Sequence, residues 1–483
     1  MQLKDPTLLR QQAYVNGQWR DAESGKTITV TNPANGEVVG TIANMGASEA
    51  RAAIEAANAA WPAWRKKTAK ERSVVLRKWS ELIAANADDL ALIMTTEQGK
   101  PLTESKLEVL SSASFIEWFA EEGKRVYGDT IPSPWPDRRV VVTKEPIGVC
   151  VAITPWNFPS AMIARKVGPA LAAGCPMVVR PADLTPFSAL ALAVLAERAG
   201  IPAGVLSVIT GESRPIGAEF TSNPLVRKLS FTGSTEVGRI LMQQCASTIK
   251  KLSLELGGNA PFIVFDDADL DAAVEGAMQS KYRNAGQTCV CANRFYVQDG
   301  IYDAFAEKFA AATTRLKIGN GAEAGVTQGP MIDEKAVAKA EEFIADAVQK
   351  GGRVIAGGKR HALGHSFFEP TVIAGVTPDM RMAKEEIFGP VAPLFRFKTE
   401  EEVIAMANDT EFGLAAYFYS RDIGRVWRVA EGLESGMVGV NSGLIATEVA
   451  PFGGVKQSGL GREGSLYGID DYLVIKYICM AGM

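Results

Sequence analysis

The sequence predicts an α/β fold built from two domains and an extended β arm. Its 483 residues exceed the length at which one hydrophobic core stops growing, so two or more domains are expected. Short β-branched runs alternate with Ala- and Leu-rich helical segments, which indicates βαβ units and parallel sheets. A segment with prolines at alternate positions leads into a β-rich run over residues 127–142, and we interpret it as an arm that leaves the first domain.

The first domain is expected to begin with helices. From Glu49 to Glu97 the pattern is helical and stops at Gly99-Lys100-Pro101, which predicts two or three helices. Four β runs follow, and a helical segment from Phe187 to Ala199 separates the third from the fourth. These runs lie at residues 140–142, 149–153, 177–179 and 205–209.

A second alternating series predicts a second α/β domain. It begins with a β run near 261–265, continues through helices around 301–316 and 334–350, and reaches a strand near 353–356. The last β run, residues 472–477, is expected to pair with the arm. The sequence contains no internal repeat and no low-complexity tract.

The composition argues against several classes of function. The 51 basic and 55 acidic residues nearly cancel, so nucleic acid is not an expected partner. The polar start and the lack of a long apolar run predict a cytoplasmic protein without a membrane span. Six scattered cysteines, with no zinc-type pair, fit a reducing compartment, and no metal is expected. The only histidines, His361 and His365, leave little material for a buried histidine base.

The run from Lys281 to Cys291 contains a candidate nucleophile. Cys289 follows a polar, glycine-containing approach and precedes a β-like segment at 294–297. A reachable thiolate is a strong soft nucleophile at neutral pH. The alternative, a buried structural cysteine, is equally compatible with the local sequence.

Glu255 is a candidate general base. It lies among leucines with Gly257-Gly258 behind it, and an apolar frame raises the proton affinity of a carboxyl group. Taken alone, the local sequence favours the alternative, a surface glutamate on an edge strand.

Two strand-to-helix turns are candidate ligand-binding turns. The turn at Thr232–Gly238 offers backbone amides and an N-cap to a phosphate, although its GxxxxG spacing also occurs in turns that bind nothing. In the other turn, Asn157 lies between prolines and aromatic residues, and its amide is a fixed donor suited to an oxyanion. Packing of a rigid turn is the alternative interpretation for Asn157.

Six strings, taken together, closely resemble the aldehyde dehydrogenase superfamily in order and spacing across nearly the whole chain. They are Pro-Trp-Asn-Phe-Pro (155–159), Phe-Thr-Gly-Ser-Thr (231–235), Leu-Glu-Leu-Gly-Gly-Asn (254–259), Gly-Gln-Thr-Cys (286–289), Glu-Glu-Ile-Phe-Gly-Pro (385–390) and Pro-Phe-Gly-Gly-Val-Lys-Gln-Ser-Gly (451–459). Within the superfamily, residues 115–124, the Cys289-Val290-Cys291 pair and residues 459–464 resemble the bacterial succinate-semialdehyde dehydrogenases.

The resemblance implies a Rossmann-like cofactor domain, an α/β catalytic domain and a β arm that extends a neighbour's sheet. The expected boundaries are 1–126 and 147–256 for the NAD(P)-binding domain, 257–460 for the catalytic domain, and 127–146 and 461–483 for the oligomerisation arm. It also implies a homo-oligomer, which we expect to be a tetramer built as a dimer of dimers, with a dimer as the alternative.

The resemblance also implies a mechanism. Cys289 attacks the aldehyde, and the Asn157 amide together with the Cys289 backbone N–H holds the oxyanion. Hydride transfer to the nicotinamide leaves a thioester on Cys289, and Glu255 activates the water that hydrolyses it.

The expected cofactor is NAD, with NADP also accepted. By resemblance, Gly233 and Ser234 lie at the pyrophosphate and Glu386 holds the nicotinamide ribose. Asp183 suits a ribose 2′-hydroxyl and repels a 2′-phosphate, whereas Arg180 attracts that phosphate. The full set of expected cofactor contacts is Trp156, Arg180, Asp183, Gly233, Ser234, Glu386 and Phe388.

The expected substrate is a small anionic aldehyde. Arg165 and Arg283 match the two arginines that hold the distal carboxylate in semialdehyde dehydrogenases, and Phe452 also belongs to the substrate pocket. Ala446 occupies the position of the family's serine, which removes one donor and makes room. Succinate semialdehyde is the first expectation, with sulfolactaldehyde and glutarate semialdehyde as alternatives. A reversible Cys289–Cys291 disulfide is a further hypothesis.

Three other functions fit the sequence less well. A CoA-acylating relative is disfavoured because Glu255, the expected water activator, is present. A thiol hydrolase, an enzyme of a different class, would need His361 or His365 near Cys289. A non-catalytic scaffold is disfavoured because Cys289, Glu255 and Asn157 occur together.

Overall fold

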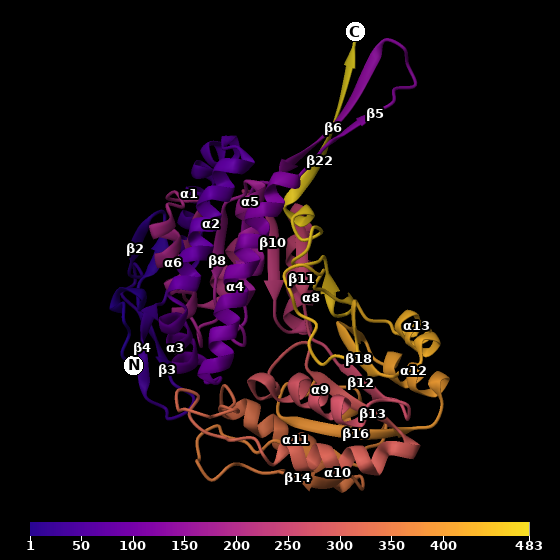
Figure 1. Cartoon of the computed structure of the whole chain (residues 1–483). Helices are drawn as coiled ribbons and strands as arrows, with labels where there is room; N and C mark the ends of the chain where they lie inside the picture. Colours follow the sequence, from indigo (N-terminus) through magenta and orange to yellow (C-terminus); the bar gives the residue numbers. More distant parts are fainter. Residues whose placement is uncertain (483) are drawn as a thin grey trace.

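The computed structural model describes residues 1–482. Two mostly parallel sheets, each with helices on both faces, form the body, and a three-stranded arm projects from it (Figure 1). The α/β fold expected from the sequence is therefore confirmed. No helix within the described residues is both long and apolar enough to cross a membrane.

The first sheet has the strand order β2-β1-β9-β8-β7-β10-β11-β21. Its central strands are parallel, whereas antiparallel pairs close both ends. The strands are β1 (Ala13–Val15), β2 (Gln18–Arg20), β7 (Val149–Ile153), β8 (Met177–Arg180), β9 (Leu206–Val208), β10 (Val226–Thr232), β11 (Lys251–Glu255) and β21 (Gly459–Leu460).

Helices cover both faces of this sheet. One face carries α2 (Ala69–Ala85), α3 (Ala87–Gln98), α4 (Leu102–Glu122), α5 (Ala161–Ala173) and α6 (Phe187–Ala199). The other carries α1 (Ala47–Lys66), α7 (Ser213–Ser222) and α8 (Thr235–Cys245). The helical prediction for residues 49–97 is confirmed, with three helices. The last of them, α3, ends at Gly99, whose φ of 96° is left-handed and suits glycine.

Helix α5 is the element that brings charge into the interior. Every one of its residues is buried, as its largely apolar sequence requires. It nevertheless carries Arg165 and Lys166, and buried cations need an anion close by.

The second sheet has the order β14-β15-β16-β13-β12-β18-β19 and is parallel except for β14 with β15. Its strands are β12 (Ala260–Val264), β13 (Ala292–Gln298), β14 (Arg353–Ala356), β15 (Thr371–Ala374), β16 (Val391–Phe397), β18 (Ala415–Tyr419) and β19 (Met437–Val440). Helices α9 (Leu270–Tyr282) and α10 (Tyr302–Thr313) share one core with the sheet, and α11 (Glu334–Gln349), α12 (Glu400–Asn408) and α13 (Ile423–Gly432) share another.

The arm consists of β5 (Asp129–Ile131), β6 (Arg138–Pro146) and β22 (Leu473–Ala481), in the order β22-β6-β5. The expected pairing of the last β run with the arm is confirmed, because β22 runs antiparallel to β6 along its whole length. Short hairpins pair β3 (Thr27–Thr31) with β4 (Val38–Ala43), and β17 (Phe412–Gly413) with β20 (Val455–Lys456). The domain boundaries stay predictions. Strand β21, from the segment assigned to the catalytic domain, joins the first sheet.

Candidate active site

The loop that carries Cys289 is shaped by an unusual turn after α9. Asn284, Ala285 and Gly286 have φ values of 52°, 53° and 75° in succession. A Cβ on Gly286 would lie 2.3 Å from the carbonyl oxygen of Gly389, so only glycine fits there. The turn directs the chain so that Cys289, which is partly exposed, lines a cavity between the two sheets.

The Cys289 thiol is held in its protonated form. Burial raises its pKa to about 12, and the nearby Glu255 carboxyl acts in the same direction, whereas the guanidinium of Arg165 opposes them. A thiol in this state needs a base to take its proton before it can attack.

Asn157 lies in the turn that follows β7 and is 3% exposed. Its side-chain Nδ2 donates to the carbonyl oxygen of Gln287 at 3.0 Å, and its Oδ1 accepts from the N–H of Phe158 at 3.1 Å. The amide has a second hydrogen that can be donated to a ligand. Asn157 lines the same cavity as Cys289, so an oxyanion donor and a nucleophile meet there.

This cavity, of about 250 Å³, gathers residues from β10 and the turns at the ends of first-sheet strands, and from α11 and the loops that precede β13 and β16 of the second sheet. The rings of Trp156 and Phe388 form one wall, with their centroids 5.6 Å apart and edge to face. The predicted residues that line it are Trp156, Asn157, Gly233, Ser234, Cys289, Glu386 and Phe388. Neither His361 nor His365 is among the described residues that line it, which removes the base that a thiol hydrolase would need.

The cavity has the features that a dinucleotide needs. Ser234 caps the N-terminus of α8, so its free backbone N–H groups and helix dipole suit a phosphate. Opposite, Glu386 accepts the N–H of Gly258 at 2.9 Å, and burial raises the pKa of its carboxyl to about 7. A carboxylate with free acceptor capacity suits ribose hydroxyls.

Arg180 and Asp183 lie outside the residues that line this cavity, and they pair with each other. Nη2 of Arg180 donates to Oδ2 of Asp183 at 2.6 Å and to the carbonyl oxygen of Gly211 at 2.9 Å. The guanidinium of Arg180, which would attract a 2′-phosphate, is thus already paired with the carboxylate of Asp183.

Glu255 is not a surface residue of an edge strand, as its local sequence favours. It ends β11, which lies between β10 and β21, and it is 3% exposed. Burial raises the pKa of its carboxyl well above the usual value, and Glu463 raises it further. The local sequence was misleading because β21, which covers this strand, comes from residues 459–460.

The sequence predicted no role for Lys166 and Glu463, which the structure brings to the site. Nζ of Lys166 donates to Oε1 of Glu463 at 2.5 Å and to Oγ1 of Thr232 at 2.6 Å. The sequence held two signals for this pair. Lys166 is a second cation on an apolar helix, and Glu463 lies within residues 459–464. Neither reveals the partner, because the two residues lie 297 positions apart.

Arg165 is 6% exposed and stacks over aromatic rings, 4.3 Å from the centroid of Phe452 and 4.8 Å from that of Phe115. Its nearest carboxylate oxygen, Oε2 of Glu463, is 4.0 Å away. Within residues 1–482, its Nε and Nη1 have no hydrogen-bond partner. Arg165 therefore has donors available for an anion.

Arg283 and Ala446 line a second, very small cavity of about 10 Å³. Thr288 and Val290, the two neighbours of Cys289 in the chain, also line it. Cys291 is buried and donates to the carbonyl oxygens of Lys281 and Ala292, both at 3.4 Å.

Comparison with known proteins agrees with this geometry. A model of the aldehyde dehydrogenase family matches residues 19–478. The chain belongs to the aldehyde dehydrogenase family. It is therefore an oxidoreductase that acts on aldehydes, and the family recognised in the sequence is confirmed.

Several curated relatives are similar over their full length. The chain is 68% identical over 483 residues to the glutarate-semialdehyde dehydrogenase of Pseudomonas aeruginosa, and covers 100% of both chains. It is 67% identical over 480 residues to the NADP(+) succinate-semialdehyde dehydrogenase of Escherichia coli, covering 99% of this chain and 100% of that protein. It is also 67% identical over 483 residues to the 3-sulfolactaldehyde dehydrogenase of Pseudomonas putida, covering 100% and 99%.

A solved structure shows the same fold. The succinate-semialdehyde dehydrogenase of Burkholderia pseudomallei matches with a TM-score of 0.99 and 71% identity, and the match covers 99% of each chain.

Proposed function

We propose that this aldehyde dehydrogenase oxidises a short anionic aldehyde to the corresponding acid with NAD(P), and that succinate semialdehyde is its substrate. The guanidinium of Arg165 is the observation that carries the proposal. It is buried, and two of its nitrogens lack a hydrogen-bond partner among the described residues. Lys166 engages Oε1 of Glu463, and Oε2 lies 4.0 Å from Nη1 of Arg165, beyond hydrogen-bond distance. A buried guanidinium is costly unless an anion meets it, and a substrate carboxylate supplies that anion.

The small cavity beside Ala446 supports a short substrate, and Arg283 also lines a more open cavity of about 300 Å³. The cavity that Ala446 lines holds about 10 Å³, roughly the room that one water needs. Loss of the serine hydroxyl therefore opens little volume for a longer or bulkier anion. The relatives carry names for all three substrates at 67–68% identity, so glutarate semialdehyde and sulfolactaldehyde are the competitors to measure.

Cys289 and Asn157 account for the first half of the reaction. The nearby Glu255 carboxylate takes the thiol proton and later releases it to solvent, and Sγ of Cys289 forms a bond to the carbonyl carbon while the carbonyl oxygen becomes an oxyanion. The free hydrogen of Asn157 Nδ2 and the Cys289 backbone N–H hold that oxygen. When bound, NAD(P) accepts the hydride from the aldehyde carbon. The restored carbonyl leaves a thioester on Cys289.

Glu255 accounts for the second half. Its carboxyl has a raised pKa, so once ionised it is an effective base toward a water molecule. The water oxygen bonds to the thioester carbon, its proton passes to Glu255, and the bond to Sγ breaks to release the acid. Lys166 and Glu463 lie beside this carboxyl and set its electrostatic environment.

NAD is the proposed preferred cofactor, and NADP is also accepted. The pairing of Asp183 with Arg180 supports this preference, because a 2′-phosphate must displace a 2.6 Å contact and approach a carboxylate. We expect a higher kcat/KM with NAD than with NADP, and a shift toward NADP in Asp183→Ala. Equal or better efficiency of the wild-type enzyme with NADP contradicts the proposal.

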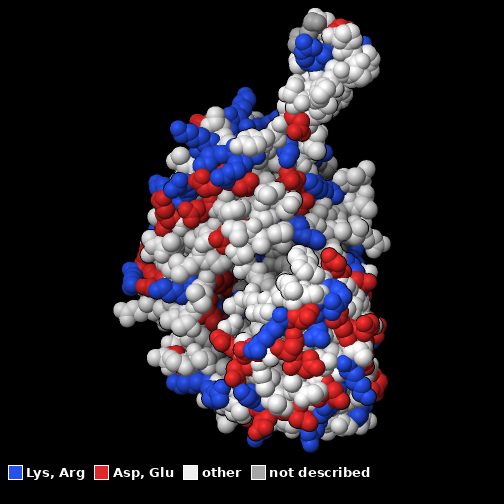
Figure 2. Space-filling view, turned by 45° about the vertical axis from the view of Figure 1, so that its right-hand side comes forward, with Lys and Arg blue, Asp and Glu red and all other residues white. Residues whose placement is uncertain are grey.

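A homo-oligomer, with a dimer of dimers as its form, is also proposed. The arm has no core of its own, and Ile475 and Tyr477 on β22 are 74% and 59% exposed. In the space-filling view charged side chains of both signs cover the body, whereas most of the arm is uncharged (Figure 2). An exposed apolar arm is typical of a surface that a second copy covers.

The deciding experiment measures kcat/KM by NADH absorbance for succinate semialdehyde, glutarate semialdehyde and sulfolactaldehyde. We expect the highest value for succinate semialdehyde. In Arg165→Met, activity on these anions should fall at least about tenfold, since the pocket loses its donors. Activity on butyraldehyde, a neutral aldehyde of similar length, should change little. An equal loss on both kinds of aldehyde contradicts the role of Arg165, and a preference for sulfolactaldehyde contradicts the substrate.

A further inference from the structure

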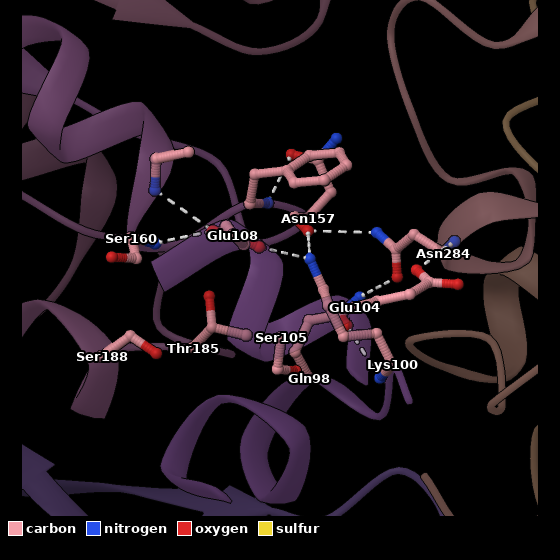
Figure 3. A network of polar contacts seen from close by, with 12 residues as sticks. Gln98, Lys100, Glu104, Ser105, Glu108, Asn157, Ser160, Thr185, Ser188 and Asn284 are labelled. Atoms are coloured by element: carbon pink, nitrogen blue, oxygen red, sulfur yellow. Dashed lines mark hydrogen bonds and ion pairs between the residues drawn. The ribbon is translucent and has the colours of Figure 1, made fainter. Parts of the chain in front are cut away.

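A buried ion pair contacts the main chain of the turn that carries Asn157 (Figure 3). Nζ of Lys100 lies 2.6 Å from Oε2 of Glu108 and donates to the main-chain carbonyl oxygen of Asn157, also at 2.6 Å. Lys100 is 2% exposed and Glu108 is 6% exposed. The ammonium group also lies over the ring of Phe158, 4.0 Å from its centroid.

Glu108 holds the far end of the same turn. Its other oxygen, Oε1, accepts the backbone N–H groups of Ser160 and Ala161 at 3.0 and 3.1 Å. These groups open α5, where a carboxylate is favoured by the helix dipole. One carboxylate and one ammonium group therefore fix residues 157–161 at both ends.

Asn284 ties this turn to the loop of the nucleophile. Its Nδ2 donates to the carbonyl oxygens of Asn157 at 3.0 Å and of Gln287 at 3.3 Å, and its Oδ1 accepts from Gln98 at 2.9 Å. Gln287 in turn accepts from the Asn157 side chain at 3.0 Å. The oxyanion donor and the loop that ends at Cys289 thus share one hydrogen-bonded frame.

We infer that Lys100, paired with Glu108, is a positioning residue for oxidation, which fixes the Asn157 peptide so that its amide meets the oxyanion. This inference rests on the proposed function, in which Asn157 is the oxyanion donor. A buried ion pair seldom adds more stability than an apolar pair of the same size, so stability alone does not explain it. Positioning of the Asn157 amide explains the pair, because a displacement of about 1 Å at a reacting group costs roughly a hundredfold in rate.

The test is a double-mutant cycle on the full-length enzyme. The pair variant Lys100→Met/Glu108→Gln removes both charges together, which avoids leaving one of them buried alone. It is made in the wild-type protein and in Asn157→Ala. Two rates are measured with saturating NAD, namely single-turnover NADH formation from succinate semialdehyde and alkylation of Cys289 by iodoacetamide, which builds no oxyanion.

We expect the pair variant to lower the rate of NADH formation at least about tenfold and to leave alkylation within about twofold of wild type. In the Asn157→Ala background the pair variant should cause no further loss, since no donor remains to be positioned. If the pair variant lowers the rate of NADH formation by the same factor in Asn157→Ala as in the wild-type protein, the inference is overturned. It is also overturned if the pair variant lowers the rate of alkylation as much as the rate of NADH formation. A wild-type rate in Asn157→Ala alone overturns the proposed function instead.

Lys106→Met is the matched control, because Lys106 is on α4, the helix of Glu108, and forms an exposed ion pair with Asp88 at 2.7 Å. It should keep wild-type rates. If the pair variant does not fold, as judged by thermal unfolding, Lys100→Arg takes its place. It retains the ion pair, so it should fold, and its longer, planar head should displace the Asn157 peptide and slow NADH formation. A wild-type rate in Lys100→Arg contradicts the inference.

Discussion

At the scale of single residues, the chemistry of this site depends on small differences between side chains. Ala446 and Arg283 line the same small cavity, and the proposed function places Ala446 where a serine hydroxyl would meet the substrate carboxylate. We expect Ala446→Ser to raise kcat/KM for succinate semialdehyde by about tenfold, since the added hydroxyl donates to the carboxylate. Ala450→Ser, four residues further on and outside that lining, should have no effect. An unchanged kcat/KM in Ala446→Ser shows that Arg165 and Arg283 suffice to hold the substrate carboxylate.

The raised pKa of the Glu386 carboxyl predicts that cofactor binding depends on pH. Burial raises the pKa of its carboxyl to about 7, so the group is mostly neutral below that pH and ionised above it. The ionised form accepts hydrogen bonds from ribose hydroxyls more strongly. The Kd for NAD, measured by fluorescence titration, should therefore fall about fivefold as the pH rises through this pKa.

Glu386→Gln should remove this pH dependence. Its neighbour Glu385 is the matched control, because it is exposed and pairs with Arg381 at 2.9 Å. Glu385→Gln should keep the wild-type profile. A pH dependence that persists in Glu386→Gln assigns the titration to another group.

At the scale of elements, the turn between α9 and Cys289 tolerates little change. Gly286 has a φ of 75°, and a Cβ there would lie 2.3 Å from a backbone oxygen. We expect Gly286→Ala to lower kcat by about a hundredfold, since the loop must shift. Gly300→Ala is the control, because a Cβ at Gly300 meets nothing within 4 Å. Equal kcat in the two variants contradicts the proposed rigidity of the turn.

At the scale of the whole molecule, the arm is the part that the chain leaves uncovered. Ile475 on β22 is 74% exposed. If a second copy covers this strand, Ile475→Lys should lower the molar mass measured by light scattering, because a charge cannot be buried in an apolar interface without a partner. Val38→Lys is the control, since Val38 is 64% exposed on β4, far from the arm (Figure 1). An unchanged mass in Ile475→Lys indicates that the arm is not an interface.

Local patterns predicted much of the fold. The three helices within residues 49–97 follow from their periodicity and their stops, and the pairing of β22 with the arm follows from a final β run. The position of β21 could not be predicted, because two residues far along the chain join the first sheet there. Strand β21 also covers Glu255, so the sequence around Glu255 favoured an exposed position although the residue is buried.

The sequence by itself determined the family and the set of reactive side chains, because Cys289, Asn157, Glu255 and Glu386 sit in strings whose order and spacing are distinctive. Only the tertiary structure decided their states and their neighbours. The pKa values of Cys289 and Glu386 are raised by burial, which depends on packing between both sheets. The contacts of Lys166 with Glu463 and of Lys100 with Asn157 join residues 297 and 57 positions apart. Such pairs form because folding brings distant segments into a low-dielectric interior, where each charge must find a partner.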